Sequence, residues 1–243
     1  MIYIIKHIDI EGPGTLGDFL RKKNIKFKII DLGAGEKLPK FAKDVDGVII
    51  LGGPMNVYEE NKYPFLKEED RFIKEVIAKE IPFMGICLGS QLLSKAAGAS
   101  VVKSPVKEVG FFDVELTKEG QRDPLFAGLE DKINIYHWHE DMFNIPDDGK
   151  LLATANGCPH QAFKVGQCAY GLQFHVEVTD VSINEWATEY IKDHVELKIK
   201  MEKMMADYQK KKGAFNKTAE QLYSNFLNII EKAKHVTLSH RAN

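Results

Sequence analysis

The chain has 243 residues, of which 44% are hydrophobic and 28% charged, and its formal net charge at pH 7 is −2. This length allows one large domain, or one ordinary domain with an appendage, and either can bury a substantial core. A net charge so near zero gives no indication of binding to nucleic acid or to a membrane surface. No apolar run reaches the length of a membrane span, and the apolar start over residues 1–5 lacks the features of a signal peptide.

Three cysteines, Cys87, Cys158 and Cys168, form an odd set without the spacing of a metal-binding motif. An odd number leaves at least one thiol free, which is typical of a reducing compartment. We therefore expect a cytoplasmic protein, with neither a bound cofactor nor a metal ion.

Strands and helices alternate through the first 99 residues. Strands are predicted over residues 2–6, 25–31, 45–53 and 81–86, and helices over residues 15–24 and 64–80. Thr15 and Asp18 predict a capping box for the first helix, and apolar residues at helical spacing mark the second. This alternation predicts a flavodoxin-like, doubly wound α/β fold with a mainly parallel central sheet and ligands at the carboxyl ends of its strands.

Beyond Ala99 the pattern changes to short strands separated by turns. We expect strands near residues 108–116, 133–137, 150–155, 161–165 and 168–174, as antiparallel additions at one edge of the sheet. From Ser182 the chain is helical, with one apolar stripe up to Tyr208 and a second one after Gly213. The sequence thus predicts a domain over residues 1–181 and a helical C-terminal extension over residues 182–243, which packs on the domain or forms the seam of a homodimer.

The stretch IPFMGICLGSQ, residues 81–91, predicts a strand, a sharp turn at Cys87 and a helix rich in small residues. Gly85 and Gly89 lie two residues to either side of Cys87, which is the pattern of a nucleophile elbow. Glycines give such a turn the room it needs, and a helix N-terminus favours the thiolate. Cys87 is therefore the candidate nucleophile.

A nucleophilic cysteine needs a base and a group that orients the base. In FHVE, His175 and Glu177 stand two apart at the end of a predicted strand, so both side chains leave on one face. Taken alone, this motif is more often a core histidine beside a surface glutamate. With Cys87 it predicts a triad in which Glu177 orients the ring of His175.

Acyl transfer also needs donors for a developing oxyanion. The backbone N–H of Leu88 in the elbow is one candidate. Gly52 or Gly53 in LGGP, at the end of the third strand, is another, because glycine lets the backbone approach a ligand closely. By itself, LGGP is equally typical of a plain turn.

GGP, G-x-C-x-G-x-Q and F-H-x-E, in this order and each at a strand end, resemble the class I glutamine amidotransferase family over roughly residues 1–180. LGGPMNVYE, GFFDVEL and HWHEDMF are most similar to its stand-alone members related to the amidotransferase domain of GMP synthetase. The resemblance implies hydrolysis of the side-chain amide of glutamine through a cysteinyl γ-glutamyl thioester, with ammonia delivered to a partner synthetase.

The same resemblance implies a role for each matching residue. Cys87 is the nucleophile, His175 the base and Glu177 its orienter; Gly53 and Leu88 are the oxyanion donors; Gly52, Gln91 and Asp141 contact the substrate, Asp141 near its amino group. Two positions depart from the family pattern, since Val176 replaces the usual proline and Glu140 stands where a glycine is common.

A rival interpretation is a nucleotide-binding or regulatory module without catalysis. Gly12–Gly17 matches G-x-G-x-x-G, and Asp31 ends the next strand at nearly the expected distance. However, residues 7–11 separate the first strand from Gly12, whereas the fingerprint has its first glycine in the tight turn itself. His137 and His139 share a strand face and suit a metal, but with no cysteine or third histidine nearby we favour packing or substrate contact.

No Gly-x-x-x-x-Gly-Lys-Ser/Thr loop and no S-G-G-x-D-S type motif occurs in the chain, so it carries no visible machinery that activates an acceptor for ammonia. Two enzyme hypotheses follow: a glutaminase subunit that works with a separate synthetase, and a self-sufficient γ-glutamyl peptide hydrolase or transferase. Intracellular cysteine peptidases of similar fold usually have histidine directly after the cysteine, where this chain has Leu88.

Overall fold

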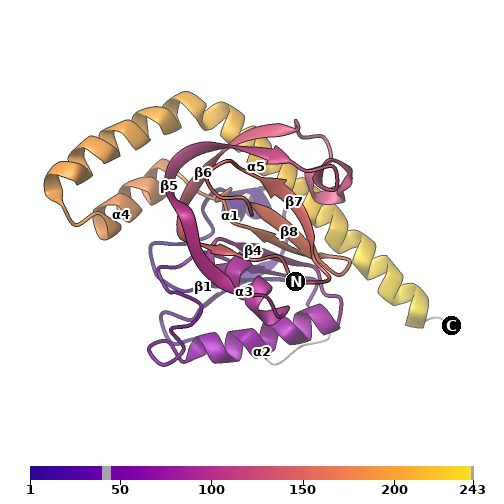
Figure 1. Cartoon of the computed structure of the whole chain (residues 1–243). Coiled ribbons are helices and arrows are strands. Elements are labelled where there is room, and N and C mark those ends of the chain that lie inside the picture. The colour runs from indigo at the N-terminus through magenta and orange to yellow at the C-terminus, as the bar shows by residue number, and fades with distance from the viewer. Residues whose placement is uncertain (40–44, 242–243) are drawn as a thin grey trace.

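The computed structural model describes residues 1–39 and 45–241 as a mixed β-sheet covered by helices on both faces (Figure 1). The strands are β1 (Ile2–Lys6), β2 (Phe27–Asp31), β3 (Gly47–Ile50), β4 (Phe83–Ile86), β5 (Val101–Leu116), β6 (Lys132–Phe143), β7 (Lys150–Thr154), β8 (Ala162–Val165) and β9 (Ala169–Leu172). The helices are α1 (Gly14–Lys22), α2 (Phe65–Ala78), α3 (Leu88–Ala96), α4 (Asp180–Tyr190) and α5 (His194–Arg241), with 3-10 turns η1 (Gly120–Arg122) and η2 (Pro124–Phe126).

The strand order across the sheet is β2-β1-β3-β4-β9-β8-β7-β5-β6. The first five strands in this order are parallel to one another, and the remaining pairs are antiparallel. The prediction of a mainly parallel central sheet with antiparallel edge strands is therefore confirmed.

The placement of β9 among the antiparallel additions was wrong. β9 pairs antiparallel with β8 but parallel with β4, where Gly85 lies opposite Gly171. A tight hairpin joins β8 to β9, and since β8 runs against the parallel strands, β9 must run with them. Its direction follows from the long-range pairing with β4 rather than from its own residues.

The predicted strands at 108–116 and 133–137 are parts of longer ones. β5 has 16 residues and β6 has 12, and they pair from Val101 opposite Phe143 to Glu115 opposite Lys132. A shift in register between Lys103 and Glu108 interrupts this ribbon. Such a bulge re-aims side chains, and here it lies beside the cavity described below.

Helices cover both faces of the sheet (Figure 1). Residues of α2 and α3 form one apolar cluster with one face of the parallel strands, and residues of α1, α4 and α5 form a second cluster with the other face. The carboxyl ends of β3, β4 and β9 lie side by side between these layers, because the three strands are parallel neighbours.

The C-terminal extension differs from the predicted pair of helices divided at Gly213. Its long helix α5 continues through Gly213 to Arg241. Phe215 and Phe226 on α5 are each 1% exposed, and both lie in the core cluster of the domain. Burial of such rings outweighs the roughly 1 kcal/mol that a glycine costs inside a helix. The apolar stripe thus packs on the chain's own domain, while the homodimer and the boundary at residue 181 stay predictions.

The predicted capping box of Thr15 and Asp18 is absent. Pro13 is the N-cap of α1, and Asp18 pairs with Arg21 at 2.7 Å. The Thr15 hydroxyl instead lies 2.9 Å from the hydroxyl of Tyr223 on α5. This side chain therefore joins α1 to the C-terminal helix. Among the helices that the structure describes, none combines the length and the apolar character needed to cross a bilayer.

Candidate active site

The turn at Cys87 has the backbone of an elbow. Cys87 has φ 50° and ψ −107°, which is unusual for a residue with a side chain, and α3 begins directly after it. A Cβ on Gly85 would lie 2.3 Å from the carbonyl oxygen of Gly89, and one on Gly89 would lie 2.2 Å from that of Ile50. Both glycines are therefore required for β3, β4 and α3 to pack this closely, as the sequence pattern predicted.

The sulfur of Cys87 has three polar neighbours. Its thiol donates to the carbonyl oxygen of Trp138 over 3.8 Å, and the amide nitrogen of Gln173 donates to Sγ over 3.9 Å. The third neighbour is the ring of His175, which lines the same cavity as Cys87 and whose pKa the sulfur raises. Cys87 is only 7% exposed, so the sulfur lies in a sheltered position at the end of β4.

The His175 ring lies between Cys87 and Glu177. Its Nδ1–H donates to Glu177 Oε1 over 2.7 Å, and the backbone N–H of Val176 donates to Glu177 Oε2 over 2.9 Å. Complete burial lowers the pKa of His175, but Glu177 and Cys87 outweigh it and hold that pKa well above its usual range. Trp186 of α4 packs edge-on against the ring at 4.8 Å between centroids. The geometry therefore suits an imidazole that holds a proton for the sulfur.

The segment Gly52–Gly53 faces the same sulfur from the end of β3. A Cβ on Gly52 would lie 2.5 Å from Glu11 Oε2 and 3.1 Å from His175 Cε1, and one on Gly53 would lie 2.9 Å from Leu88 Cδ2. Side chains at either position would clash with the residues around the sulfur. The main chain of this segment thus borders the sulfur from the side opposite the loop after β9.

His7 holds the Gly52–Gly53 segment and was missed by the sequence analysis. Its Nδ1–H donates to the carbonyl oxygen of Gly52 over 2.7 Å, and its Nε2 lies 3.0 Å from Glu69 Oε1 on α2. Burial lowers the pKa of His7, but the neighbouring Glu69 carboxylate raises it by more, so the net shift is upward. Because both ring nitrogens face acceptors, the protonated ring is favoured and the peptide after Gly52 is fixed in orientation.

Glu11 is a second group that the sequence did not indicate. It is 6% exposed, and its Oε1 accepts a hydrogen bond of 2.6 Å from the Tyr190 hydroxyl of α4. Burial raises the pKa of the Glu11 carboxyl, and burial together with Glu11 raises that of Tyr190. No local motif marks either residue, since Glu11 lies in a polar loop and Tyr190 lies on a helix 179 residues later in the chain.

A cavity of about 490 Å³ opens in front of Cys87. Gln91 and Asp141, predicted to contact substrate, line it together with Gly53, Cys87 and His175, whereas Gly52, Leu88 and Glu177 do not line it. Gln91 Nε2 donates to the carbonyl oxygen of Asp141 over 3.2 Å. The structure thus gathers the predicted site residues around one volume.

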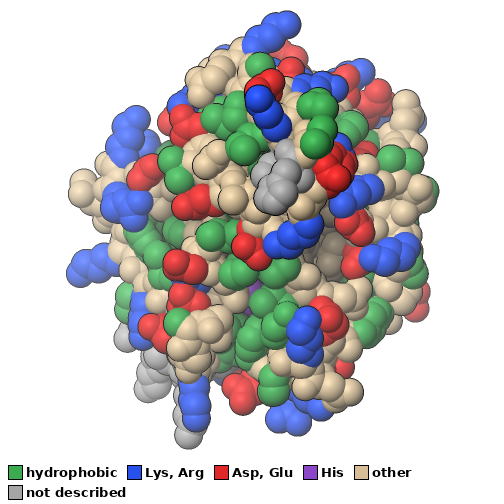
Figure 2. All heavy atoms as spheres, turned by 90° about the vertical axis from the view of Figure 1, so that its left-hand side faces the viewer, with side chains coloured by type: hydrophobic (Ala, Val, Ile, Leu, Met, Phe, Trp, Pro, Cys, Tyr) green, Lys and Arg blue, Asp and Glu red, His purple; other side chains and the backbone are tan. Residues whose placement is uncertain are grey.

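The charge on the cavity wall is mixed. The lining includes five acidic side chains and four lysines, among them Lys107 paired with Glu140, and Lys103 2.9 Å from Asp141. Glu140 therefore adds no unpaired charge to the cavity. Figure 2 shows the face on which α4 and the start of α5 lie, where acidic and basic side chains alternate around a depression with histidine at its base. Such a wall suits a ligand that carries charges of both signs.

The glycine-rich loop of the rival interpretation is occupied by the chain itself. The N–H of Thr15 at the start of α1 donates to the carbonyl oxygen of Glu177 over 2.9 Å. A Cβ on Gly14 would lie 2.0 Å from that same oxygen. A dinucleotide would place its pyrophosphate at this helix N-terminus, where the strand end after β9 already lies. The geometry speaks against a nucleotide site here.

Similarities to known proteins agree with this site. A family model described as glutamine amidotransferase class-I matches residues 16–196. The glutamine amidotransferase-like protein YfeJ of Salmonella typhimurium is 34% identical over 181 residues, which cover 73% of this chain and 76% of that protein. One subunit of the glutamine-hydrolyzing GMP synthase of Methanobrevibacter smithii is 34% identical over 139 residues, which cover 56% of this chain and 66% of that protein.

The fold is matched over nearly the whole chain. A crystal structure of a glutamine amidotransferase from Thermotoga maritima has a TM-score of 0.85 and 34% sequence identity, over 95% of this chain and 97% of that one. The resemblance seen in GGP, G-x-C-x-G-x-Q and F-H-x-E is therefore confirmed. The chain belongs to the class I glutamine amidotransferase family.

Proposed function

We propose that this chain is a cysteine-dependent glutaminase that hydrolyses the side-chain amide of glutamine and supplies ammonia to a separate synthetase. The observation that supports it most directly is the ring of His175, which lines one cavity with Cys87 and donates to the carboxylate of Glu177 over 2.7 Å. Nucleophile, base and orienter are the parts that acyl transfer through a thioester needs.

In the first half-reaction, Cys87 Sγ attacks the side-chain carbonyl carbon of glutamine. His175 holds the thiol proton and passes it to the departing nitrogen, so that ammonia leaves and a γ-glutamyl thioester remains. Glu177 keeps the ring in the orientation that faces the sulfur. The backbone N–H groups of Gly53 and Leu88 stabilise the negative charge on the carbonyl oxygen of the tetrahedral intermediate.

In the second half-reaction, a water molecule takes the place of ammonia. His175 removes its proton, the hydroxide attacks the thioester carbon, and the proton returns to the sulfur as glutamate leaves. Gln91 and Asp141, which line the cavity, contact the substrate throughout, and Asp141 interacts with its α-amino group.

The acceptor of ammonia is activated by another polypeptide, since no nucleotide-activating motif occurs in this sequence. A relative 34% identical to this chain is one of the subunits of a GMP synthase named as glutamine-hydrolyzing. This supports a partnership in which the chain here provides ammonia and a separate synthetase consumes it. A homodimer is compatible with this arrangement and would be seen in the mass of the protein in solution.

A second candidate is a self-sufficient γ-glutamyl peptide hydrolase or transferase. The cavity of about 490 Å³ has a volume typical of pockets for drug-sized ligands. Its wall includes Tyr190, Ile191 and Lys192 from the end of α4 and the segment after it. A glutamyl group bound at Cys87 would leave room along this wall for a substituent on its γ-nitrogen.

Product analysis with and without cell extract distinguishes the two candidates. Glutamate and ammonia from glutamine, increased by extract, favour the glutaminase; turnover of γ-glutamyl peptides by the purified chain alone favours the hydrolase. Cys87→Ala should lower either activity about 10³-fold or more, with unchanged folding, because the nucleophile is lost. Retained turnover in that variant would exclude the mechanism.

Labelling with a glutamine-like diazoketone tests the nucleophile separately. Burial raises the pKa of the thiols of Cys158 and Cys168 to about 11 each, so both stay protonated near neutral pH. We expect a single adduct, on Cys87, in the wild type and in the control variant Cys168→Ala. An adduct that persists in Cys87→Ala would contradict the assignment.

A further inference from the structure

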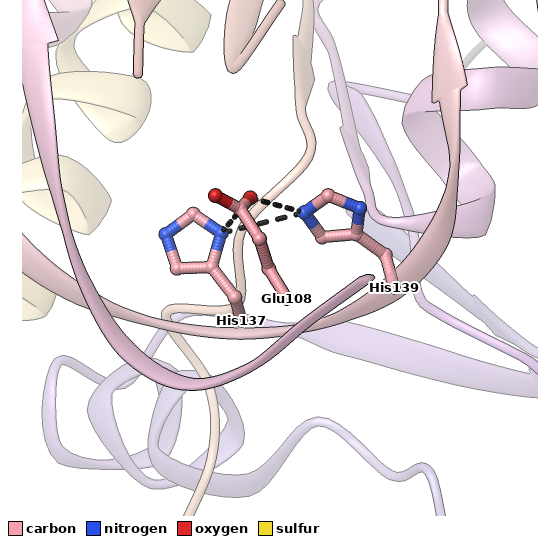
Figure 3. Close-up of side chains that lie close together, drawn as sticks. All are labelled: Glu108, His137 and His139. Atoms are coloured by element: carbon pink, nitrogen blue, oxygen red, sulfur yellow. Dashed lines mark hydrogen bonds and ion pairs between the residues drawn. The ribbon is translucent and has the colours of Figure 1, made fainter. Parts of the chain in front are cut away.

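Three buried side chains outside the triad point their donor atoms at one place (Figure 3). Glu108 comes from β5, and His137 and His139 come from the facing strand β6. Glu108 Oε2 lies 3.3 Å from His137 Nδ1 and 2.9 Å from His139 Nε2, and the two ring nitrogens are 3.4 Å apart. Their exposed fractions are 2%, 0% and 5%. Two imidazoles and one carboxylate thus form a compact triangle inside the protein.

The sides of this triangle match the spacing of ligands around a metal ion. Donor atoms about 2.0–2.1 Å from a zinc ion, at angles between octahedral and tetrahedral, lie about 2.9–3.4 Å from one another. The three measured distances fall in that range without any movement of side chains. Two imidazole nitrogens and a carboxylate oxygen are also a donor set that zinc and related divalent ions take in proteins.

The hydrogen-bonding partners of His139 strengthen the case. Its Nδ1 lies 3.2 Å from the carbonyl oxygen of Asp141, which can only accept. In the neutral ring this contact puts the proton on Nδ1 and leaves the lone pair of Nε2 facing the Glu108 carboxylate at 2.9 Å. A ring nitrogen and a carboxylate in that relation repel each other unless a proton or a metal ion lies between them. A backbone carbonyl on the far nitrogen is also the usual partner of a metal-bound histidine.

Two more buried polar atoms near the triangle lack partners among the described residues. They are Nε2 of His137 and Oε1 of Gln161, whose amide nitrogen lies 2.9 Å from Glu108 Oε2. With Nδ1 of His137 bound to a metal, the proton of the ring resides on Nε2; the ring of Phe174 lies 6.1 Å away between centroids. The amide nitrogen of Gln161 lies beside the triangle and also donates to the carbonyl oxygen of Cys158 over 3.2 Å.

We propose that Glu108, His137 and His139 bind one divalent transition-metal ion, with zinc as the best match to the donor set. The ion would cross-link β5 and β6 directly after the bulge, behind the wall from which Trp138 and Asp141 face the cavity. His139 itself lines the cavity, which gives the ion a route of entry. The role is structural, because none of the three ligands is among the residues that the proposed reaction uses. This proposal stands independently of the glutaminase assignment.

The test is a titration of Cys87→Ala protein with Co²⁺, a coloured substitute for zinc. The Cys87→Ala background removes the active-site thiol, which would otherwise compete as a ligand. We expect one equivalent to bind, with visible d–d absorption bands of nitrogen and oxygen ligands, no thiolate-to-cobalt charge-transfer band, and displacement by added Zn²⁺. Failure to bind one equivalent, or a thiolate band, would overturn the proposal and leave the hydrogen bonds among the three side chains as the explanation of the triangle.

Two variants in the same background locate the site. His137→Gln removes one ligand and should weaken Co²⁺ binding at least tenfold, while the control His160→Gln, whose ring contacts the Phe143 carbonyl at 2.8 Å, should bind as the parent does. Equal affinity in His137→Gln and the parent would refute the site. Zn²⁺ should also raise the melting temperature of the parent and of His160→Gln but not that of His137→Gln. If His137→Gln does not fold, the Co²⁺ spectrum of the parent decides alone.

Discussion

Position 176 shows how a single backbone group can affect the proposed triad. The chain has valine where the family usually has proline, and the backbone N–H of Val176 donates to Glu177 Oε2 over 2.9 Å. Proline has no such N–H. This chain therefore holds both oxygens of Glu177, one through the ring of His175 and one through its own main chain.

Val176→Pro should consequently loosen Glu177 and reduce turnover. A hydrogen bond to a charged group contributes about 1.5–3 kcal/mol, so we expect kcat to fall roughly tenfold or more, with little change in KM. The control Val176→Ala keeps the N–H and should retain the wild-type rate. Steady-state kinetics with glutamine measure both, and equal rates for the two variants would show that this hydrogen bond does not matter.

The residues that the sequence predicted are those whose neighbours are close in the chain. Cys87 lies between two glycines of its own turn, and His175 and Glu177 belong to one tetrapeptide, so short motifs were enough to propose them. Glu11 and Glu108 escaped notice because their partners, Tyr190 and two histidines, come from distant segments. These groups meet only in the folded chain, and their separation in the sequence does not indicate that they are partners.

At the scale of elements, the helix α5 has the largest part in closing the second face of the sheet. Its buried aromatic residues share one cluster with α1, α4 and the strands. Tyr223 of α5 also donates to the carbonyl oxygen of Val176 over 2.7 Å, next to the triad. The stability of the domain and the position of the strand end after β9 therefore depend on this helix.

Phe226→Ala should destabilise the protein strongly. The ring is 1% exposed, and truncation of a buried phenylalanine costs about 3–5 kcal/mol. Urea unfolding followed by circular dichroism measures the loss, with the exposed Lys210→Ala on the same helix as the control. A loss below about 1 kcal/mol would mean that α5 is only loosely attached to the domain.

Elements with a strong periodic pattern were predicted well, and those decided by tertiary contacts were not. The helix over residues 64–80 and the four parallel strands of the first half follow from local pattern. The direction of β9 and the continuation of α5 through Gly213 depend on pairing and burial far along the chain, which outweigh local propensity. The fold class was thus predictable while these two connections were not.

For the whole molecule, buried tyrosines set an alkaline limit on stability. Tyr136, Tyr208 and Tyr223 lie between the sheet and α5, and the hydroxyl of Tyr136 contacts Met204 Sδ at 3.6 Å. Burial raises the pKa of all three, that of Tyr208 to about 12. They remain neutral in the folded protein at a pH where the unfolded chain loses its tyrosine protons.

The sign of this effect follows from proton linkage. A raised pKa in the folded state means that the stabilisation is complete below the unfolded value of about 10 and is lost as pH rises toward the folded value. The free energy of unfolding should therefore fall above about pH 10, by up to about 1.4 kcal/mol per pH unit for each such group. Urea unfolding from about pH 8 to pH 11 measures it, and Tyr208→Phe should give a shallower decline. A stability that stays flat in the wild type would contradict the burial of these hydroxyls.

The positive φ of Cys87 sets the stability of the fold against the activity proposed for this protein. The turn that aims the sulfur is one in which glycine would rest comfortably and any side chain is strained. Cys87→Gly would relieve this strain and make the fold more robust, but under the proposed mechanism it would also abolish turnover. At position 87, the proposed activity therefore requires cysteine, whereas the stability of the fold favours glycine.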